Sequence, residues 1–234
     1  MAVEAVVFDW GGTLSVFADV EMEDMWRLAA EHLAPHRADE VCARLVAVEA
    51  RSWERIAVDQ RSTTLSCLLA EASDALGLDV AEAVLEEAAL HHLDSWTPHV
   101  RHEPDAASTL AALRARGLRI GLLSNTHWPR SFHEHFLERD GLDGLIDVRC
   151  YTSELAHTKP HPDAFAAVLD ALGVEPGAAV FVGDRPYDDV SGAKAVGMRA
   201  VLRRNPLVPP YDVDPDAVIE RLSELPPIVE AWAC

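Results

Sequence analysis

Lysine is nearly missing from this 234-residue chain: of its 20 basic residues only Lys159 and Lys194 are lysine, against 39 Asp and Glu. The formal net charge is −19 with histidine neutral. A nucleic-acid-binding protein needs a basic surface to neutralise phosphates, and a peripheral membrane protein needs basic tracts to meet anionic lipid. We therefore expect neither nucleic acid nor a membrane as a partner, and the oligomeric state stays open.

Long apolar runs and paired cysteines are missing as well. The longest apolar stretches fall short of the roughly 20 residues that a membrane-spanning helix needs. The first residues carry Glu4 and Asp9 where a signal peptide would be apolar. Four cysteines are scattered along the chain, Cys42, Cys67, Cys150 and Cys234. Because they form no CxxC pair and no Cys/His metal spacing, we expect reduced thiols and a cytoplasmic protein.

Apolar mass, by contrast, is plentiful. Hydrophobic residues make up 49% of the chain and include six tryptophans. At this length such a composition supports one large domain, or one domain with a sizeable insertion, around a packed core. The composition excludes disorder of the whole chain in spite of its charge.

The hydrophobic pattern changes abruptly within the N-terminal third of the chain. Residues 3–8 form a valine-rich apolar run that stops at Asp9 and the Gly11-Gly12 pair, which is typical of a buried strand entering a tight turn. Helical periodicity then dominates, over 22–33, 39–58, 65–76 and 80–93. We interpret 15–96 as an all-helical insertion in a core made of 1–14 and 97–234. Its Trp26, Trp53 and Trp96 are expected to pack inside it, with one ring available to line a substrate entrance.

Strands and helices alternate after Pro98. Strands are predicted at 119–123, 148–151, 179–182 and 199–202, and helices at 104–116, 129–138, 161–172 and 187–196. This alternation is typical of right-handed βαβ units, so the predicted fold class is α/β, with a Rossmann-like parallel sheet and helices on both faces. Residues 205–215 are rich in proline and are predicted to form a loop or a sheet edge.

Polar residues gather where the predicted strands end, which is where ligands bind in open parallel sheets. They are Asp9, Ser124, Asn125, Lys159, Asp184, Asp188 and Asp189. A lone carboxylate on a glycine-rich turn, a hydroxyl, a lysine and a pair of acids suit a carboxylate nucleophile that attacks a phosphoryl group, with Mg²⁺ held between acids.

Four segments carry a family resemblance: FDWGGTL, LLSNT, TKPHP and VGDRPYDD. In this order, each at a predicted strand end, they resemble the four motifs of the haloacid dehalogenase-like hydrolases. The resemblance spans about 3–202, and the helical insertion is similar to the small cap that many members carry after the first motif. It implies a hydrolase with a capped α/β core that acts on a small phosphorylated molecule.

The resemblance also implies roles for single residues. Asp9 matches the nucleophile that forms an aspartyl-phosphate, and Thr13 matches the hydroxyl that steadies the nucleophile loop. Ser124 matches the hydroxyl that binds a phosphoryl oxygen, and Lys159 matches the lysine that balances charge between the nucleophile and the transferred group. The substrate-binding positions implied are Gly12, Asn125 and His127.

A Mg²⁺ site is implied by the same match. Its ligands would be the carboxylates of Asp9, Asp184 and Asp189 and the backbone carbonyl of Gly11. Asp188 is expected to face solvent or to pair with an arginine.

One position departs from the phosphatase pattern. Two residues after the nucleophile, phosphatases and mutases of this family carry a second aspartate that protonates the leaving oxygen and later activates water, whereas this chain has Gly11. Such an acid/base group contributes about 10²–10⁴-fold, so efficient ester hydrolysis is in question. Substitutes to consider are His127 and the acidic cluster Asp19, Glu21, Glu23 and Asp24.

Three alternatives follow from Gly11. A phosphonate-cleaving branch lacks that aspartate but needs a cap lysine, and 15–96 contains none. The 2-haloacid dehalogenases also need no leaving-group acid, because halide departs unprotonated, yet they do not require the metal that Asp184 and Asp189 favour. The third alternative is a regulatory protein that binds phosphate and metal without turnover.

Overall fold

The computed structural model describes residues 2–232, and within them six parallel strands form one sheet in the order β3-β2-β1-β4-β5-β6. The strands are β1 (Ala5–Phe8), β2 (Arg119–Ser124), β3 (Val148–Tyr151), β4 (Ala179–Gly183), β5 (Arg199–Arg203) and β6 (Ala217–Ile219). β1 lies between β2 and β4, with Phe8 opposite both Leu122 and Val182. The strand order reverses at β1 and β4, so the parallel sheet opens a crevice at their carboxyl ends. The predicted α/β class is confirmed.

Nine α-helices are present in that part of the chain. They are α1 (Met22–Leu33), α2 (Ala38–Asp59), α3 (Leu65–Ala75), α4 (Glu82–Trp96), α5 (Ala106–Arg114), α6 (Arg130–Arg139), α7 (Pro162–Leu172), α8 (Gly192–Ala195) and α9 (Leu225–Ala231). None of them, among the described residues, has the length and apolarity to cross a bilayer.

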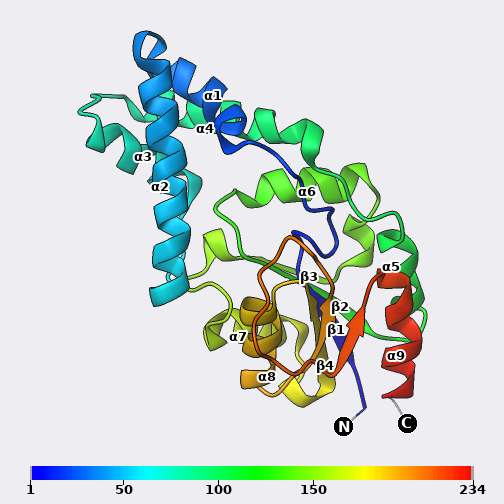
Figure 1. The fold of residues 1–234 in the computed structure, drawn as a ribbon. Coiled ribbons are helices and arrows are strands. Elements are labelled where there is room, and N and C mark those ends of the chain that lie inside the picture. The colour runs from blue at the N-terminus through cyan, green and yellow to red at the C-terminus, as the bar shows by residue number, and fades with distance from the viewer. Residues whose placement is uncertain (1, 233–234) are drawn as a thin grey trace.

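Helices cover both faces of the sheet, with α5 and α9 on one side and α7 and α8 on the other (Figure 1). Successive side chains of a strand point to opposite faces. In β1, Val6 and Phe8 accordingly join the cluster under α5, α6 and α9, while Ala5 and Val7 join the cluster under α7. Burial on both faces explains the uninterrupted apolar run at the start of the sequence.

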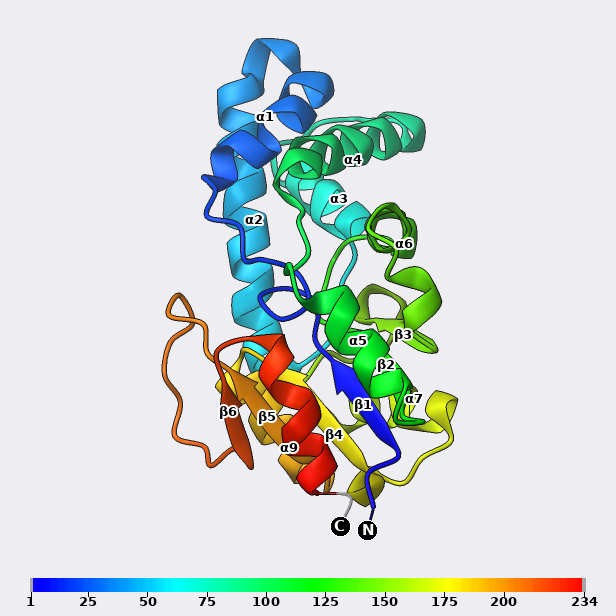
Figure 2. The same cartoon turned by 90° about the vertical axis from the view of Figure 1, so that its right-hand side faces the viewer.

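The helices α1–α4, called the helical block below, lie beyond the carboxyl ends of the strands (Figure 2). They have a hydrophobic cluster of their own around Trp26, Leu45 and Leu69, against which Trp128 and Phe132 of the sheet domain also pack. The expected packing of Trp26 inside the insertion is confirmed by its complete burial there. The block therefore covers the edge of the sheet where the polar motif residues lie.

Three backbone hydrogen bonds join the connection between α2 and α3 of the helical block to loops of the sheet domain. Thr158 N–H donates to Gln60 O (2.9 Å), Ser62 N–H to Ala156 O (3.1 Å) and Leu65 N–H to His127 O (2.8 Å). The loops before Lys159 and around His127 are thus braced by the block.

Two parts of the fold differ from the sequence prediction. The helix predicted at 187–196 is a π-helical turn, Pro186–Ser191, followed by the short α8; in this turn Val190 N–H donates to Arg185 O, five residues earlier. β6 and α9, beyond residue 202, were not predicted, since their short apolar segments show no clear period. Cys42, Cys67 and Cys150 are free thiols, as expected. Cys234 lies outside the described residues.

Two buried histidines make the fold sensitive to acid. His92 stacks on Trp26 with ring centroids 3.7 Å apart, and His133 stacks on Tyr151 at 4.6 Å. Burial lowers the pKa of each to about 3. The unfolded chain protonates them near pH 6.5 and the folded chain does not, so this contribution to stability is complete above pH 6.5 and is lost as pH falls toward 3.

We expect the free energy of unfolding to fall by up to about 1.4 kcal/mol per pH unit for each of these histidines below pH 6. Urea denaturation between pH 7 and pH 4 measures it. His92→Gln should flatten the slope, whereas the exposed His36→Gln should leave it unchanged. Equal slopes for both variants would contradict the assignment.

Candidate active site

Asp9 and Asp184 lie side by side because they follow paired parallel strands. Asp9 N–H donates to Val182 O (2.9 Å), which continues the β1–β4 ladder by one residue. Asp184 begins the loop that follows β4, and Asp189 is buried in the π-helical turn just after it. All three carboxylates are at least 94% buried, with Asp9 the most exposed at 6%.

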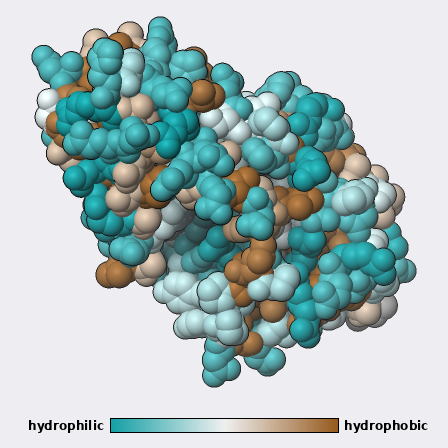
Figure 3. All heavy atoms as spheres, turned by 45° about the horizontal axis from the view of Figure 1, so that its top comes forward, coloured by the Kyte–Doolittle hydropathy of each residue, from teal (hydrophilic) through white to brown (hydrophobic). Residues whose placement is uncertain are grey.

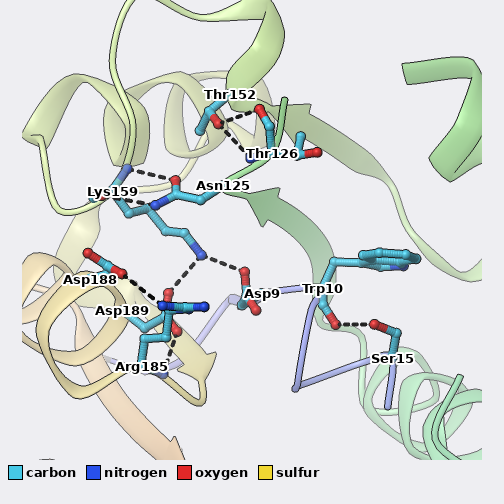
Figure 4. A network of polar contacts seen from close by, with 10 residues as sticks. All are labelled: Asp9, Trp10, Ser15, Asn125, Thr126, Thr152, Lys159, Arg185, Asp188 and Asp189. Atoms are coloured by element: carbon cyan, nitrogen blue, oxygen red, sulfur yellow. Dashed lines mark hydrogen bonds and ion pairs between the residues drawn. The ribbon is translucent and has the colours of Figure 1, made fainter. Parts of the chain in front are cut away.

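Lys159 joins two of these acids (Figure 4). Its Nζ donates to Asp9 Oδ1 at 2.6 Å and to Asp189 Oδ1 at 2.7 Å. The Lys159 side chain is only 1% exposed. A buried ammonium between two carboxylates cannot be a surface charge, so one of the two lysines of the chain is committed to this site.

Asn125 holds the Lys159 backbone in place. The Asn125 amide donates from Nδ2 to Lys159 O (3.0 Å), and its Oδ1 accepts from Lys159 N–H (2.9 Å). The Asn125 side chain is therefore a clamp on the lysine loop, and the prediction that its backbone N–H helps to bind a phosphoryl oxygen stays a prediction. Asp189 is fixed in the same way by Arg185 N–H, which donates to its Oδ2 at 2.9 Å.

The carboxylates carry more negative charge than the lysine neutralises. Burial, together with repulsion from Asp189 and Asp184, raises the pKa of Asp9 to about 7 against the attraction of Lys159. Burial and repulsion from Asp189 raise the pKa of Asp184 to about 6. Burial by itself lowers the pKa of Lys159, but attraction to Asp189 and Asp9 outweighs it and the pKa lies above its usual value.

The donor set fits a divalent cation. One ligand oxygen from each of Asp9, Asp184 and Asp189 lies within 4.8 Å of the others. Asp184 Oδ1 is buried without a hydrogen-bond partner, while its Oδ2 accepts from Asn205 Nδ2 at 2.6 Å. Three carboxyl groups face a single ammonium here, so a bound cation would offset their mutual repulsion, and hard oxygen ligands are those that Mg²⁺ prefers.

Glycine is required where the chain passes Asp184. Gly12 has φ +79°, and a Cβ there would lie 2.2 Å from Asp184 Oδ2. Its carbonyl accepts a hydrogen bond from Arg203, which is also paired with Glu103 at 2.6 Å. Gly12, which is predicted to contact substrate, therefore leaves the space that the Asp184 carboxylate occupies. Gly11 has neither constraint: nothing lies within 4 Å of a Cβ built there, and its φ is not positive.

The remaining predicted residues lie around the same crevice. Thr13 is fully buried and its Oγ1 has no hydrogen-bond partner. Ser124 ends β2 and lines a cavity of about 250 Å³ together with Gly11 and His127. Asp188 is paired with Arg185 at 4.0 Å, as expected.

His127 and the acidic cluster are poor substitutes for the missing acid. The His127 ring stacks on Trp53 at 4.0 Å, and burial lowers its pKa to about 4, so it is neutral near pH 7. The acids of the cluster are exposed, and none of them lines the cavities that Gly11 lines, although Ala18 and Met22 beside them do. The members of the cluster are Asp19, Glu21, Glu23 and Asp24.

Several contributing residues were missed from the sequence. Asn205 and Arg203 reach the site from the segment after β5, and Glu49 of α2 lines the 250 Å³ cavity. Both Trp53 and Trp96 line that cavity, where one ring was expected. Asn205 in a proline-rich loop carries no local pattern that points to Asp184, so only the tertiary contact identifies it.

Comparisons with known proteins agree with this geometry. Residues 3–197 match the family model of the haloacid dehalogenase-like hydrolases. The phosphoglycolate phosphatase of Rhodospirillum rubrum is 33% identical over 210 residues, which cover 85% of this chain and 78% of that protein.

Two solved structures share the whole fold at 27% identity. A 2-haloacid dehalogenase from Pseudomonas syringae superposes with a TM-score of 0.73, and a HAD phosphatase from Thermococcus onnurineus with 0.69. Each comparison covers 99% of this chain and 100% of the other. The family match, on a parallel sheet whose carboxyl edge gathers Asp9, Lys159, Asp184 and Asp189, shows that this chain belongs to the haloacid dehalogenase-like hydrolases.

Proposed function

We propose that this hydrolase is a Mg²⁺-dependent phosphatase that cleaves a small phosphate monoester through an aspartyl-phosphate on Asp9. The observation that carries the proposal is the convergence of Asp9, Asp184 and Asp189 with Lys159 between the first and the last. The similarity to a phosphoglycolate phosphatase supports the same reaction class.

In the first step, a carboxylate oxygen of Asp9 attacks phosphorus, the ester P–O bond breaks, and its electron pair departs on the leaving oxygen. Lys159, held at 2.6 Å from Asp9 Oδ1, offsets the negative charge that gathers as the phosphoryl group approaches. Ser124 is the hydroxyl we assign to a phosphoryl oxygen, because it ends β2 and faces the cavity.

In the second step, water attacks the phosphorus of the aspartyl-phosphate and the bond between the Asp9 oxygen and phosphorus breaks. Inorganic phosphate departs, and the Asp9 carboxylate is regenerated. Mg²⁺, held by Asp9, Asp184 and Asp189 and offered the carbonyl of Gly11, would supply charge neutralisation and alignment of the phosphoryl oxygens. The helical block, which has its own hydrophobic cluster, is proposed to act as the cap on this site, with 1–14 and 97–234 as the core.

Dehalogenation of a 2-haloacid is the second candidate. Gly11 and the TM-score of 0.73 to a 2-haloacid dehalogenase favour it. The unpartnered Asp184 Oδ1 beside two further acids favours the metal-dependent reaction instead.

The test of the proposal is phosphate release from a panel of phosphate monoesters with Mg²⁺ and with EDTA, beside halide release from 2-chloropropionate. Mg²⁺-dependent phosphate release that Asp9→Asn abolishes is the expected result. Halide release without metal would identify the dehalogenase. Vanadate binding with no turnover of any substrate would identify the regulatory protein.

Mg²⁺ affinity should depend on Asp184. Asp184→Ala removes an acid whose Oδ1 has no protein partner, and we expect at least a tenfold loss of Mg²⁺ affinity by calorimetry. Asp188→Ala, in the same loop but paired with Arg185, is the matched control and should bind Mg²⁺ almost as the parent does. An Asp184→Ala protein that binds Mg²⁺ like the parent would disprove the metal assignment.

A further inference from the structure

We propose that the natural substrate is an aryl phosphate, whose leaving group is an uncharged aromatic alcohol bound between Gly11 and the helical block. This proposal rests on the phosphatase reaction above and narrows its substrate class. Three features support it: the aromatic lining of the cavity beside Asp9, the absence of Lys and Arg side chains from that lining as the structure describes it, and the absence of an acid at position 11.

The cavity is large enough for a ring and is lined by rings. It has a volume of about 250 Å³ and continues into a second cavity of about 150 Å³, with Trp10, Phe17, Trp96 and Trp128 lining both. A cavity of roughly 150 Å³ with apolar walls already binds benzene in another protein. Flat aromatic walls favour a flat aromatic guest through edge-to-face and offset contacts.

Two of the lining aromatic side chains are partly exposed to solvent. Phe17 is 42% exposed and Trp53 is 38% exposed, and both line the larger cavity. On the face drawn in Figure 3, hydrophilic residues predominate, and apolar residues form several groups among them. Exposed aromatic side chains beside a catalytic crevice are typical of a binding surface for an apolar ligand group.

Within residues 2–232, an anionic leaving group would find no cationic side chain in the larger cavity. No Lys or Arg is found among the described residues that line either cavity, and Glu49 is the one acid in the larger. Its histidines, His127 and His133, are neutral near pH 7 because burial lowers their pKa values to about 4 and about 3. Arg185 lines an adjoining cavity, which shares Trp53 and Asn125 with the larger one, and there it is paired with Asp188. Moving a carboxylate into such surroundings is costly.

The lack of an acid at position 11 also favours an aryl phosphate as the substrate. An alkoxide leaves badly unless a nearby acid protonates it, and no acid stands at position 11. When Asp9 attacks an aryl phosphate, the P–O bond can break with its electron pair on a phenolate, which is stable enough to depart and to take its proton from water afterwards. A phenolic leaving group therefore removes the need for an acid at position 11 in the first step, which is the step in which esters with different leaving groups differ.

The experiment compares kcat/KM for four esters with Mg²⁺. They are phenyl phosphate, 3-carboxyphenyl phosphate, cyclohexyl phosphate and phosphoglycolate. The two aryl esters have leaving phenols of nearly equal acidity and differ in charge, whereas phenyl and cyclohexyl phosphate share shape and neutrality and differ in leaving-group acidity. We expect phenyl phosphate to exceed each of the others by at least tenfold, and cyclohexyl phosphate to inhibit competitively with little turnover.

A charge placed at the mouth of the cavity tests the binding side separately. Phe17→Arg, a change at a solvent-exposed position, should raise the kcat/KM ratio of 3-carboxyphenyl to phenyl phosphate about fivefold. Val58→Arg, at a position 84% exposed and outside both cavities, is the matched control and should leave the ratio unchanged.

Failure of this inference is distinct from failure of the proposed function. If phosphoglycolate is cleaved as well as phenyl phosphate, in an Asp9-dependent manner, the enzyme is a phosphatase and the aryl assignment is wrong. If 3-carboxyphenyl phosphate is cleaved as well as phenyl phosphate, the requirement for an uncharged leaving group is wrong. If no ester releases phosphate, both proposals fall. An unchanged ratio in Phe17→Arg would mean that the leaving group does not occupy this cavity.

Discussion

Placing a carboxylate at position 11 should raise Mg²⁺-dependent hydrolysis of an alkyl phosphate by about 10²-fold or more, since a positioned acid/base contributes roughly 10²–10⁴-fold. Gly11→Asp supplies the proton that an alkoxide needs on departure, and the base that the second step needs for water. Hydrolysis of an aryl phosphate should rise far less, because its phenolate leaves without a proton. Steady-state kinetics on cyclohexyl and phenyl phosphate measure the contrast.

The backbone can accept this substitution. Nothing lies within 4 Å of a Cβ built at position 11, and the φ of Gly11 is not positive. The Trp10 side chain is held by a hydrogen bond from its Nε1–H to His102 at 3.1 Å. Gly12→Asp is the matched control, because φ +79° and a Cβ 2.2 Å from Asp184 Oδ2 forbid a side chain there, and it should lose activity on both esters. Equal gains on both esters in Gly11→Asp, or none, would show that the missing acid does not limit this enzyme.

Removing the ammonium of Lys159 should lower kcat by about 10²–10³-fold while leaving Mg²⁺ binding intact. In Lys159→Met, Asp9 and Asp189 lose the cation that holds them at 2.6 and 2.7 Å, and the charge that offsets the phosphoryl group is lost. The loss of one such electrostatic group typically lowers kcat by about 10²–10³-fold. Breaking a buried ion pair also costs about 3–5 kcal/mol of stability in the absence of metal.

Lys194→Met is the natural control, because Lys194 is the other lysine of the chain and pairs with Asp216 at the surface at 3.1 Å. It should change neither kcat nor the unfolding free energy by a large amount. Calorimetry with Mg²⁺ separates the roles: the three acids remain in Lys159→Met, so Mg²⁺ affinity should be kept or increased. A Lys159→Met enzyme with parental kcat would remove Lys159 from the mechanism.

Much of the fold could be predicted from the period of the hydrophobic residues and from the polar residues that follow the strands. The valine-rich run before Asp9 indicates a strand buried on both faces, and β1 is such a strand. The helical texture of 15–96 indicated helices, and α1–α4 fill that range with boundaries shifted by a few residues. These patterns are local, so sequence is enough to identify them.

The segment after residue 202 shows where local patterns fail. β6 is three residues long and pairs with β5, and α9 is seven residues long and packs under α5. Elements this short have no measurable period, and their stability comes from burial against a sheet that already exists. Asn205, in the same segment, contacts Asp184 across 21 residues, which no pattern in either stretch encodes.

By itself, then, the sequence determined the α/β class, the motif residues at the ends of the strands, and the absence of an acid at position 11, because each depends on residue identity or on short-range period. Only the tertiary structure shows that the Asn125 side chain holds the Lys159 backbone by hydrogen bonds and that the Asp184 carboxylate fits because Gly12 has no side chain. It also decided that tryptophans from three separate parts of the chain line one cavity. The physical reason is distance along the chain: Lys159 and Asp9 are 150 residues apart, and only the packing of the parallel strands brings their side chains to 2.6 Å.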